Sequence, residues 1–256
     1  MKALTVILLL FSLCITGTAQ NDNAWKRLLS KETYVNVQGV LPYRLYVPDS
    51  IIPGQKPAFV LFLHGAGERG DDNELQLLHG VKEFMSEDIR TEYYFILIAP
   101  QCPESARWVE VDWSMPSHKM PRISMPLSQT FSLMDSLISA YNVDTNQIYV
   151  TGLSMGGFGA WDALCRRPGF FAAAMPVCGG GDETQAGLIA HTPIRAFHGK
   201  LDHLVIPGRT LNMVNAVNLN GGKAEAIIFG DIGHLCWNRV YQNHDNIHWL
   251  FSNWKQ

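Results

Sequence analysis

The sequence lacks the features that mark several classes of protein. Its formal charge is −3 and it contains no run of lysine or arginine, which argues against nucleic acid as a partner. The His-Glu-x-x-His pattern is absent and the cysteines match no zinc-binding spacing, so we expect neither a metal nor another cofactor. Long apolar runs are scarce, and the one at residues 3–13 is too short to span a bilayer comfortably.

That apolar run belongs to a leader-like amino terminus. Lys2 precedes it and the small residues 16–19 follow it, a pattern typical of a secretory signal peptide that is cleaved after Ala19. Cys14 leaves a lipid-anchored signal open, although bulky Leu13 stands where such signals have a small residue. We therefore expect residues 1–19 to be removed, and residues 20–256 to form one secreted or periplasmic domain with no stable membrane insertion.

Export bears on the cysteines, because an oxidising compartment allows them to pair. Four of them follow the expected cleavage site: Cys102, Cys165, Cys178 and Cys236. Four cysteines allow three connectivities, which the sequence does not separate.

Strand-like and helical patterns alternate along the chain, which predicts an α/β fold with a mostly parallel sheet and helices on both faces. The expected strands lie at 58–63, 93–99, 147–151, 170–178, 193–198 and 224–229, after a hairpin at 33–48 that turns at Gly39. The expected helices lie at 74–86, 127–141, 155–165, 207–220 and 236–251. The gap at 179–192 holds one short helix at most, which excludes a large cap there and predicts an open cleft.

The most informative stretch is the turn between the strand at 147–151 and the helix after it. It contains Gly152-x-Ser154-x-Gly156, the spacing of a nucleophile elbow. In such a turn the serine takes a strained backbone conformation, and glycines two residues away on either side keep side chains out of the crowded bend. Ser154 is therefore the candidate nucleophile.

A second glycine-rich turn, His64-Gly65-Ala66-Gly67, follows the buried strand at 58–63. Backbone N–H groups of such a turn can point into a cavity and meet the negative charge that develops on an ester oxygen. We expect the N–H groups of Ala66 and Met155 to form this oxyanion hole. For His64 itself we favour a structural role.

An acid and a base follow two later strands. Asp202 comes after the strand at 193–198 and His234 after the strand at 224–229, so both should reach the sheet edge that carries Ser154. Asp231 also follows a strand and is an alternative to Asp202. His198 and His203 are weaker alternatives to His234, because they would have to reach Ser154 from the acid's own loop.

The segment at 100–126 has many prolines and little periodicity, and unstructured loops of this length are often functional. It contains Trp108 and Trp113. Their rings can stack on a sugar or a phenolic acyl group, or can equally well cover the core as an apolar lid.

Taken together, these segments resemble the α/β-hydrolase superfamily, and within it the secreted esterase and predicted-peptidase branch related to polyhydroxybutyrate depolymerases and feruloyl or acetylxylan esterases. The segments that carry the resemblance are 63–70, 99–103 with Trp108, 152–157, 178–182, 197–202 and 233–234. The chain departs from the branch at residues 200–201 and 235–236, which bears on substrate contacts rather than on the serine, acid and base.

The resemblance implies an α/β-hydrolase fold and a secreted serine hydrolase that cleaves carboxylic esters through an acyl-enzyme. Ser154 would attack, His234 would move the proton and Asp202 would orient His234. The substrate would be a small-molecule or polysaccharide-borne ester, with acyl groups on carbohydrate or phenolic compounds. The alternatives are a serine peptidase of the prolyl-oligopeptidase type and a secreted binding protein without activity.

Overall fold

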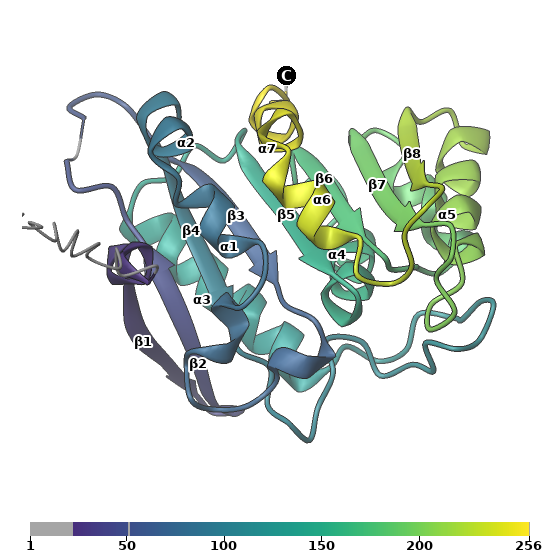
Figure 1. Cartoon of the computed structure of the whole chain (residues 1–256). Helices are drawn as coiled ribbons and strands as arrows, with labels where there is room; N and C mark the ends of the chain where they lie inside the picture. Colours follow the sequence, from purple (N-terminus) through teal and green to yellow (C-terminus); the bar gives the residue numbers. More distant parts are fainter. Residues whose placement is uncertain (1–22, 51, 256) are drawn as a thin grey trace, which may run out of the picture.

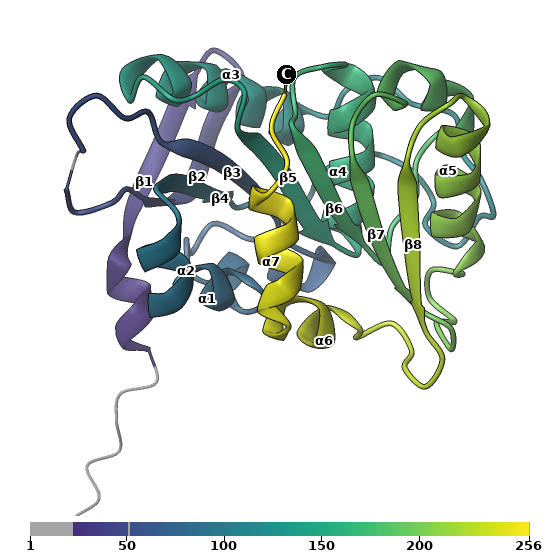
Figure 2. The same cartoon turned by 90° about the horizontal axis from the view of Figure 1, so that it is seen from above.

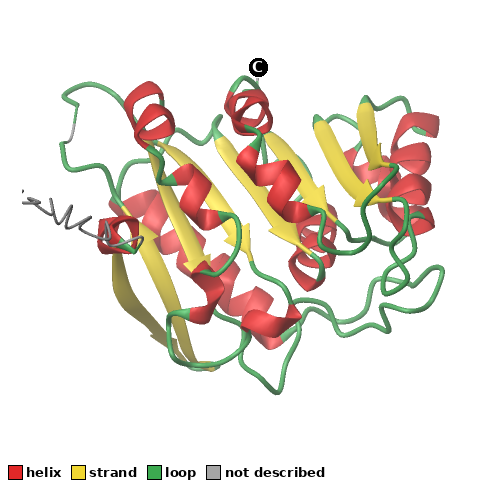
Figure 3. Cartoon of the chain, in the orientation of Figure 1, coloured by secondary structure: helices red, strands yellow, loops and turns green. Residues whose placement is uncertain are grey.

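The computed structural model describes residues 23–50 and 52–255, so the expected signal peptide lies outside the described residues. An eight-stranded sheet runs through this part of the chain (Figures 1 and 3). In chain order its strands are β1 (Leu29–Asn36), β2 (Gly39–Tyr46), β3 (Ala58–Leu63), β4 (Phe95–Pro100), β5 (Ile148–Leu153), β6 (Ala173–Val177), β7 (Ile194–Gly199) and β8 (Ala224–Phe229). Across the sheet the order is β1-β2-β4-β3-β5-β6-β7-β8.

The sheet is mostly parallel, as predicted. β1 and β2 form the expected hairpin at Gly39, and β2 is antiparallel to β4. From β4 to β8 all neighbouring strands are parallel. The carboxyl ends of parallel strands lie at one edge of a sheet, so the loops after β3, β5, β7 and β8 open on the same side of the molecule.

Helices cover both faces of the sheet, which also confirms the prediction (Figure 2). On one face lie α3 (Met125–Ala140), α4 (Met155–Arg166) and α5 (Gly208–Leu219). On the other lie α1 (Val81–Phe84), α2 (Glu87–Glu92), α6 (Trp237–Gln242) and α7 (His244–Phe251). Each face buries its own apolar cluster, and β3, β4, β5 and β6 are buried at every position between the two.

Short 3-10 helices complete the described residues: η1 (Ala24–Leu28), η2 (Ala66–Glu68), η3 (Leu75–Leu77) and η4 (Glu183–Ile189). η4 is the short element expected between β6 and β7. None of the helices in the described ranges has the length and apolar character needed to cross a membrane.

The predicted helix at 74–86 is wrong as a continuous element. Only η3 and the single turn α1 form there, because Gly80 has φ +76 and interrupts the helical backbone. A Cβ at Gly80 would lie 2.6 Å from Phe62 and 2.7 Å from Tyr241, so the backbone must pass close to these two rings. α2, which follows, was not predicted.

Several predicted boundaries also differ, and two of these differences have a local cause. The strand expected at 170–178 begins at Ala173, because the turn at 167–170 closes with a hydrogen bond from the Phe170 N–H to the Arg167 carbonyl. The helical segment expected at 236–251 is divided into α6 and α7 at Asn243, whose side chain caps α7 by accepting from the Asp245 N–H at 3.2 Å.

Candidate active site

Ser154 lies in the sharp turn between β5 and α4. Its backbone has φ 52° and ψ −117°, a conformation that is unfavourable for a residue with a Cβ. The flanking Gly152 and Gly156 lie close to neighbouring backbone. A Cβ at Gly152 would overlap the Gly156 carbonyl, and a Cβ at Gly156 would overlap the Leu63 carbonyl. This strained turn exposes the Ser154 hydroxyl at the carboxyl edge of the sheet.

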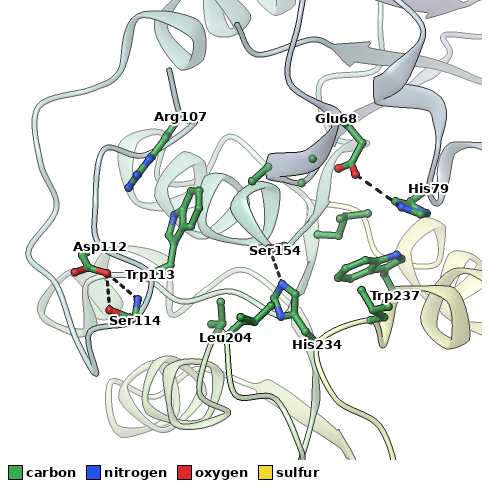
Figure 4. A pocket seen from close by; sticks show the side chains of 16 residues that line it. Glu68, His79, Arg107, Asp112, Trp113, Ser114, Ser154, Leu204, His234 and Trp237 are labelled. Atoms are coloured by element: carbon green, nitrogen blue, oxygen red, sulfur yellow. Dashed lines mark hydrogen bonds and ion pairs between the residues drawn. The ribbon is translucent and has the colours of Figure 1, made fainter. Parts of the chain in front are cut away.

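Two loops on the same edge bring an imidazole and a carboxylate to Ser154. The Ser154 Oγ lies 2.8 Å from His234 Nε2, and His234 Nδ1 lies 2.6 Å from Asp202 Oδ2 (Figure 4 shows the first contact). Since a carboxylate only accepts, Nδ1 carries the hydrogen and Nε2 is left to accept the serine proton. The structure therefore brings together the three residues that the sequence singled out, in an order suited to proton transfer.

Asp202 is held in its charged form. Its Oδ1 accepts from the N–H groups of Leu204 and Val205, both at 2.9 Å, while its Oδ2 faces His234 and, at 3.1 Å, His198 Nε2. Burial by itself raises the pKa of Asp202, but the hydrogen bonds from His198 and His234 outweigh it and hold this pKa well below the usual range. An ionised Asp202 keeps His234 in the tautomer described above.

The alternatives weighed from the sequence lie elsewhere. The carboxylate of Asp231 pairs with Arg239 at 2.7 and 3.0 Å on the surface. His203 is exposed, and His198 is fully buried with its Nε2 on Asp202 and on the Val205 carbonyl. Neither histidine contacts Ser154 in the described structure.

The loop after β3 forms the wall beside Ser154. Ala66 begins η2 and lines the same cleft as Ser154, while Met155 is the first residue of α4, where the N–H has no partner within the helix. His64 is buried and holds this loop to its neighbours. Its Nδ1 donates to the Gly65 carbonyl at 2.6 Å, and its Nε2 accepts from the Cys102 N–H at 2.9 Å. Burial lowers the pKa of His64 to about 4, which keeps the ring neutral.

The two tryptophans of the 100–126 loop have different positions. Trp108 is fully buried against β3 and α4, and its Nε1 donates to the His64 carbonyl at 3.0 Å. The interpretation of Trp108 as a substrate contact is therefore wrong. Trp113 is half-buried and lines the cleft, with the Arg107 guanidinium 4.4 Å from its ring centre.

The cleft over Ser154 has a volume of about 820 Å³ (Figure 4). One wall comes from residues 65–68 and His79, the opposite wall from Arg107 and residues 112–114. Trp237 lines the cleft beside His79, and residues 234–235 also line it. The site is thus an open cleft whose lining includes the hydrogen-bonded Ser154 hydroxyl and His234 imidazole.

Comparisons with known proteins support the fold described above. No protein-family model matches the chain. A "Probable acetylxylan esterase A" of Aspergillus fumigatus is 28% identical over 182 residues, which are 68% of this chain and 46% of that protein. A thermostable esterase of known structure superposes with a TM-score of 0.84 and 33% identity, covering 90% of this chain and 64% of that one. The chain belongs to the α/β-hydrolase superfamily.

More distant structures share the fold of this α/β-hydrolase. A ferulic acid esterase has a TM-score of 0.66 at 17% identity and covers 88% of this chain and 98% of that one. The acylaminoacyl peptidase of Pyrococcus horikoshii has a TM-score of 0.62 at 13% identity, over 86% of this chain and 39% of that one. The chain spans less than two thirds of the length of the acetylxylan esterase and of the thermostable esterase.

One group of potential metal ligands occurs among the described residues of this α/β-hydrolase. Cys178, Asp202 and His234 each offer an atom, and these atoms lie within 4.8 Å of one another. The Asp202 and His234 atoms are already paired with each other or with Ser154. A metal would have to replace the hydrogen bond that orients His234, so the donor set suits proton transfer better than metal binding.

Several cleft residues of the α/β-hydrolase were not predicted, among them His79 and Trp237. The Trp237 ring meets His234 edge-on, with centroids 5.4 Å apart. The Glu68 carboxyl lies 3.8 Å from His79, and burial raises its pKa above the usual value. The nearness of Trp237 to His234 in sequence was a signal for it, whereas nothing in the sequence placed His79 beside the loop that carries Glu68.

Proposed function

We propose that this protein is a serine hydrolase of carboxylic esters. The observation that carries the proposal is the chain of hydrogen bonds from Ser154 through His234 to Asp202, which opens on a cleft large enough for an organic ligand. The likeness to esterases, at 33% identity in the thermostable esterase, supports an ester as the substrate.

In the proposed mechanism His234 Nε2 takes the Ser154 proton while Oγ attacks the ester carbonyl. The N–H groups of Ala66 and Met155 hold the negative oxygen of the tetrahedral intermediate. His234 then gives its proton to the departing alcohol, leaving Ser154 acylated. Water repeats the sequence with His234 as base and frees the acid.

For the substrate class we propose acetyl or phenolic esters carried by carbohydrate. The names of the acetylxylan and ferulic acid esterases support this class, and the open cleft gives access to a group attached to a polymer. Trp113, backed by Arg107, offers an aromatic face on which a sugar or phenolic ring can stack. Such substrates lie outside cells, which agrees with the proposed export of residues 20–256.

The test is hydrolysis of p-nitrophenyl acetate, methyl ferulate, acetylated xylan and a peptidyl p-nitroanilide, each with and without a fluorophosphonate. We expect ester cleavage that the inhibitor blocks. Ser154→Ala should reduce kcat at least about 10⁴-fold with an unchanged circular dichroism spectrum. Ser136→Ala, which removes an exposed hydroxyl on α3, is the matched control and should remain fully active.

Other outcomes would replace the proposal. Cleavage of the amide alone would identify a peptidase. No turnover and no fluorophosphonate labelling of Ser154 would identify a binding protein on a hydrolase scaffold.

A further inference from the structure

Two cysteines meet beside the active site. The Sγ atoms of Cys178 and Cys236 lie 2.9 Å apart and both residues are fully buried. A disulfide needs about 2.0 Å, so the two sulfurs require less than about 1 Å of further approach. Cys102 and Cys165 are also buried but have no contact with another cysteine in the described residues.

Each partner is attached to a different part of the active site. Cys178 follows β6, immediately after Val177, whose carbonyl accepts from the Ser154 N–H at 2.9 Å. Cys236 lies two residues after His234, and its N–H donates to the His234 carbonyl at 2.9 Å. The Cys178 thiol donates to the same carbonyl at 3.2 Å. The cysteine pair therefore connects the strand that supports the nucleophile with the loop that carries the imidazole.

The backbone of Cys178 is constrained. Its φ is +50°, which is unfavourable for a residue other than glycine. Such conformations persist where surrounding contacts fix them, often at functional sites. Its N–H also donates to the Phe197 carbonyl in β7 at 2.8 Å, so its position is fixed from two sides.

We propose that Cys178 and Cys236 form a disulfide that fastens the His234 loop to the end of β6. Oxidised glutathione, or the disulfide of a thiol oxidoreductase, is the oxidant. The two S–H bonds break, the S–S bond forms, and two electrons and two protons pass to the oxidant, which becomes two thiols. The other two cysteines remain thiols.

The bond should form during folding. In the folded protein the hydrogen bond with Cys236, together with burial, raises the pKa of the Cys178 thiol well above its usual value. The thiolate is the species that attacks a disulfide, so exchange is slow once these residues are buried. A disulfide already formed is shielded from reductant for the same reason.

The direct test is to refold the chain from denaturant with oxidised glutathione, or with a reductant as the comparison. Free thiols are then alkylated in denaturant and the peptides are mapped without reduction. We expect one cross-linked peptide pair, containing Cys178 and Cys236, and alkylated Cys102 and Cys165. Alkylation of both Cys178 and Cys236 after oxidative refolding, or a cross-link to another cysteine, would overturn the proposal. This readout does not depend on activity, so it remains decisive even if the proposed esterase function fails.

Stability gives a second readout. Closing the loop from 178 to 236 should raise Tm of the oxidised protein by about 5–15 °C over the reduced protein. Cys236→Ala should lose this difference, while Cys165→Ala should keep it. An equal difference in Cys236→Ala would contradict the proposal, and if that variant does not fold, the peptide map of the wild-type chain decides.

Discussion

Replacement of Asp202 by asparagine tests the proposed proton path most directly. The N–H groups of Leu204 and Val205 both donate to Oδ1 at 2.9 Å, so an asparagine must place its carbonyl oxygen there. The NH₂ group of the asparagine then replaces Oδ2 and faces Nδ1 of His234. His234 is forced to accept at Nδ1 and to carry its hydrogen on Nε2, where it can no longer take the Ser154 proton.

The expected loss in kcat is about 10⁴-fold, as the same tautomer reversal causes in other Ser-His-Asp enzymes. At about 1.4 kcal/mol for each factor of ten, this corresponds to about 5.5 kcal/mol in the activation free energy. The free energy of unfolding should fall much less, by about 1–3 kcal/mol, because the NH₂ group also opposes the buried His198 Nε2–H.

The assay is steady-state hydrolysis of p-nitrophenyl acetate, with the rate of fluorophosphonate labelling of Ser154 as a second measurement. Asp231→Asn is the matched control, because it makes the same chemical change in an exposed carboxylate that pairs with Arg239. It should leave kcat unchanged. A kcat of Asp202→Asn within tenfold of wild type would refute the assignment of Asp202, and a large loss in Asp231→Asn would favour the alternative acid.

Three further expectations concern residues around this path. The pKa of His64 is about 4 when folded and about 6.5 when unfolded, so the unfolded state binds the extra proton and stability falls as pH drops from about 6.5 to 4. His64 should account for about 3 kcal/mol of this loss in unfolding free energy. The measurement is urea unfolding of wild type and His64→Gln at several pH values, and the same pH dependence in both proteins would contradict the prediction. Trp108→Phe should reduce the unfolding free energy by about 1–3 kcal/mol and leave KM unchanged. Trp113→Ala should raise KM several-fold and leave Tm unchanged. The reverse result would make Trp113 the structural residue and Trp108 the substrate contact. Gly199→Ala should lower kcat at least tenfold, because the new Cβ would overlap the Gly233 carbonyl and displace the neighbouring His234. An unchanged kcat would show that the loop adapts to the substitution.

Much of the fold followed from the sequence because the central strands β3 to β6 are buried on both faces. A strand such as β3 has no position that faces water, so it appears as an unbroken apolar run. Ser154 was found for a related reason, since only glycines fit on either side of the elbow. These are local steric requirements, so a short stretch of sequence is enough to predict them.

What the sequence did not reveal depends on contacts between distant segments. Trp108 and Trp113 lie in the same aperiodic loop. Their positions differ because the Trp108 indole donates a hydrogen bond to the His64 carbonyl, 44 residues away along the chain. The break at Gly80 depends on its approach to Phe62 and Tyr241, which belong to β3 and α6. No pattern within either segment could have predicted those neighbours.

The three site residues differ in how firmly the fold holds them, and this explains why the cysteine pair matters. Ser154 follows β5, which is buried at every position, whereas His234 follows β8, an edge strand that is mostly half-buried and pairs with β7 alone. The loop before His234 contacts the turn after β7, where the Leu201 N–H donates to the Ile232 carbonyl at 3.0 Å. A displacement of about 1 Å at the base is enough to reduce catalysis severely, while it costs little folding free energy at the rim of a sheet. The proposed disulfide between this loop and the end of β6 would therefore act where the sheet provides least support. Its loss should affect the placement of His234 more than the packing of the core.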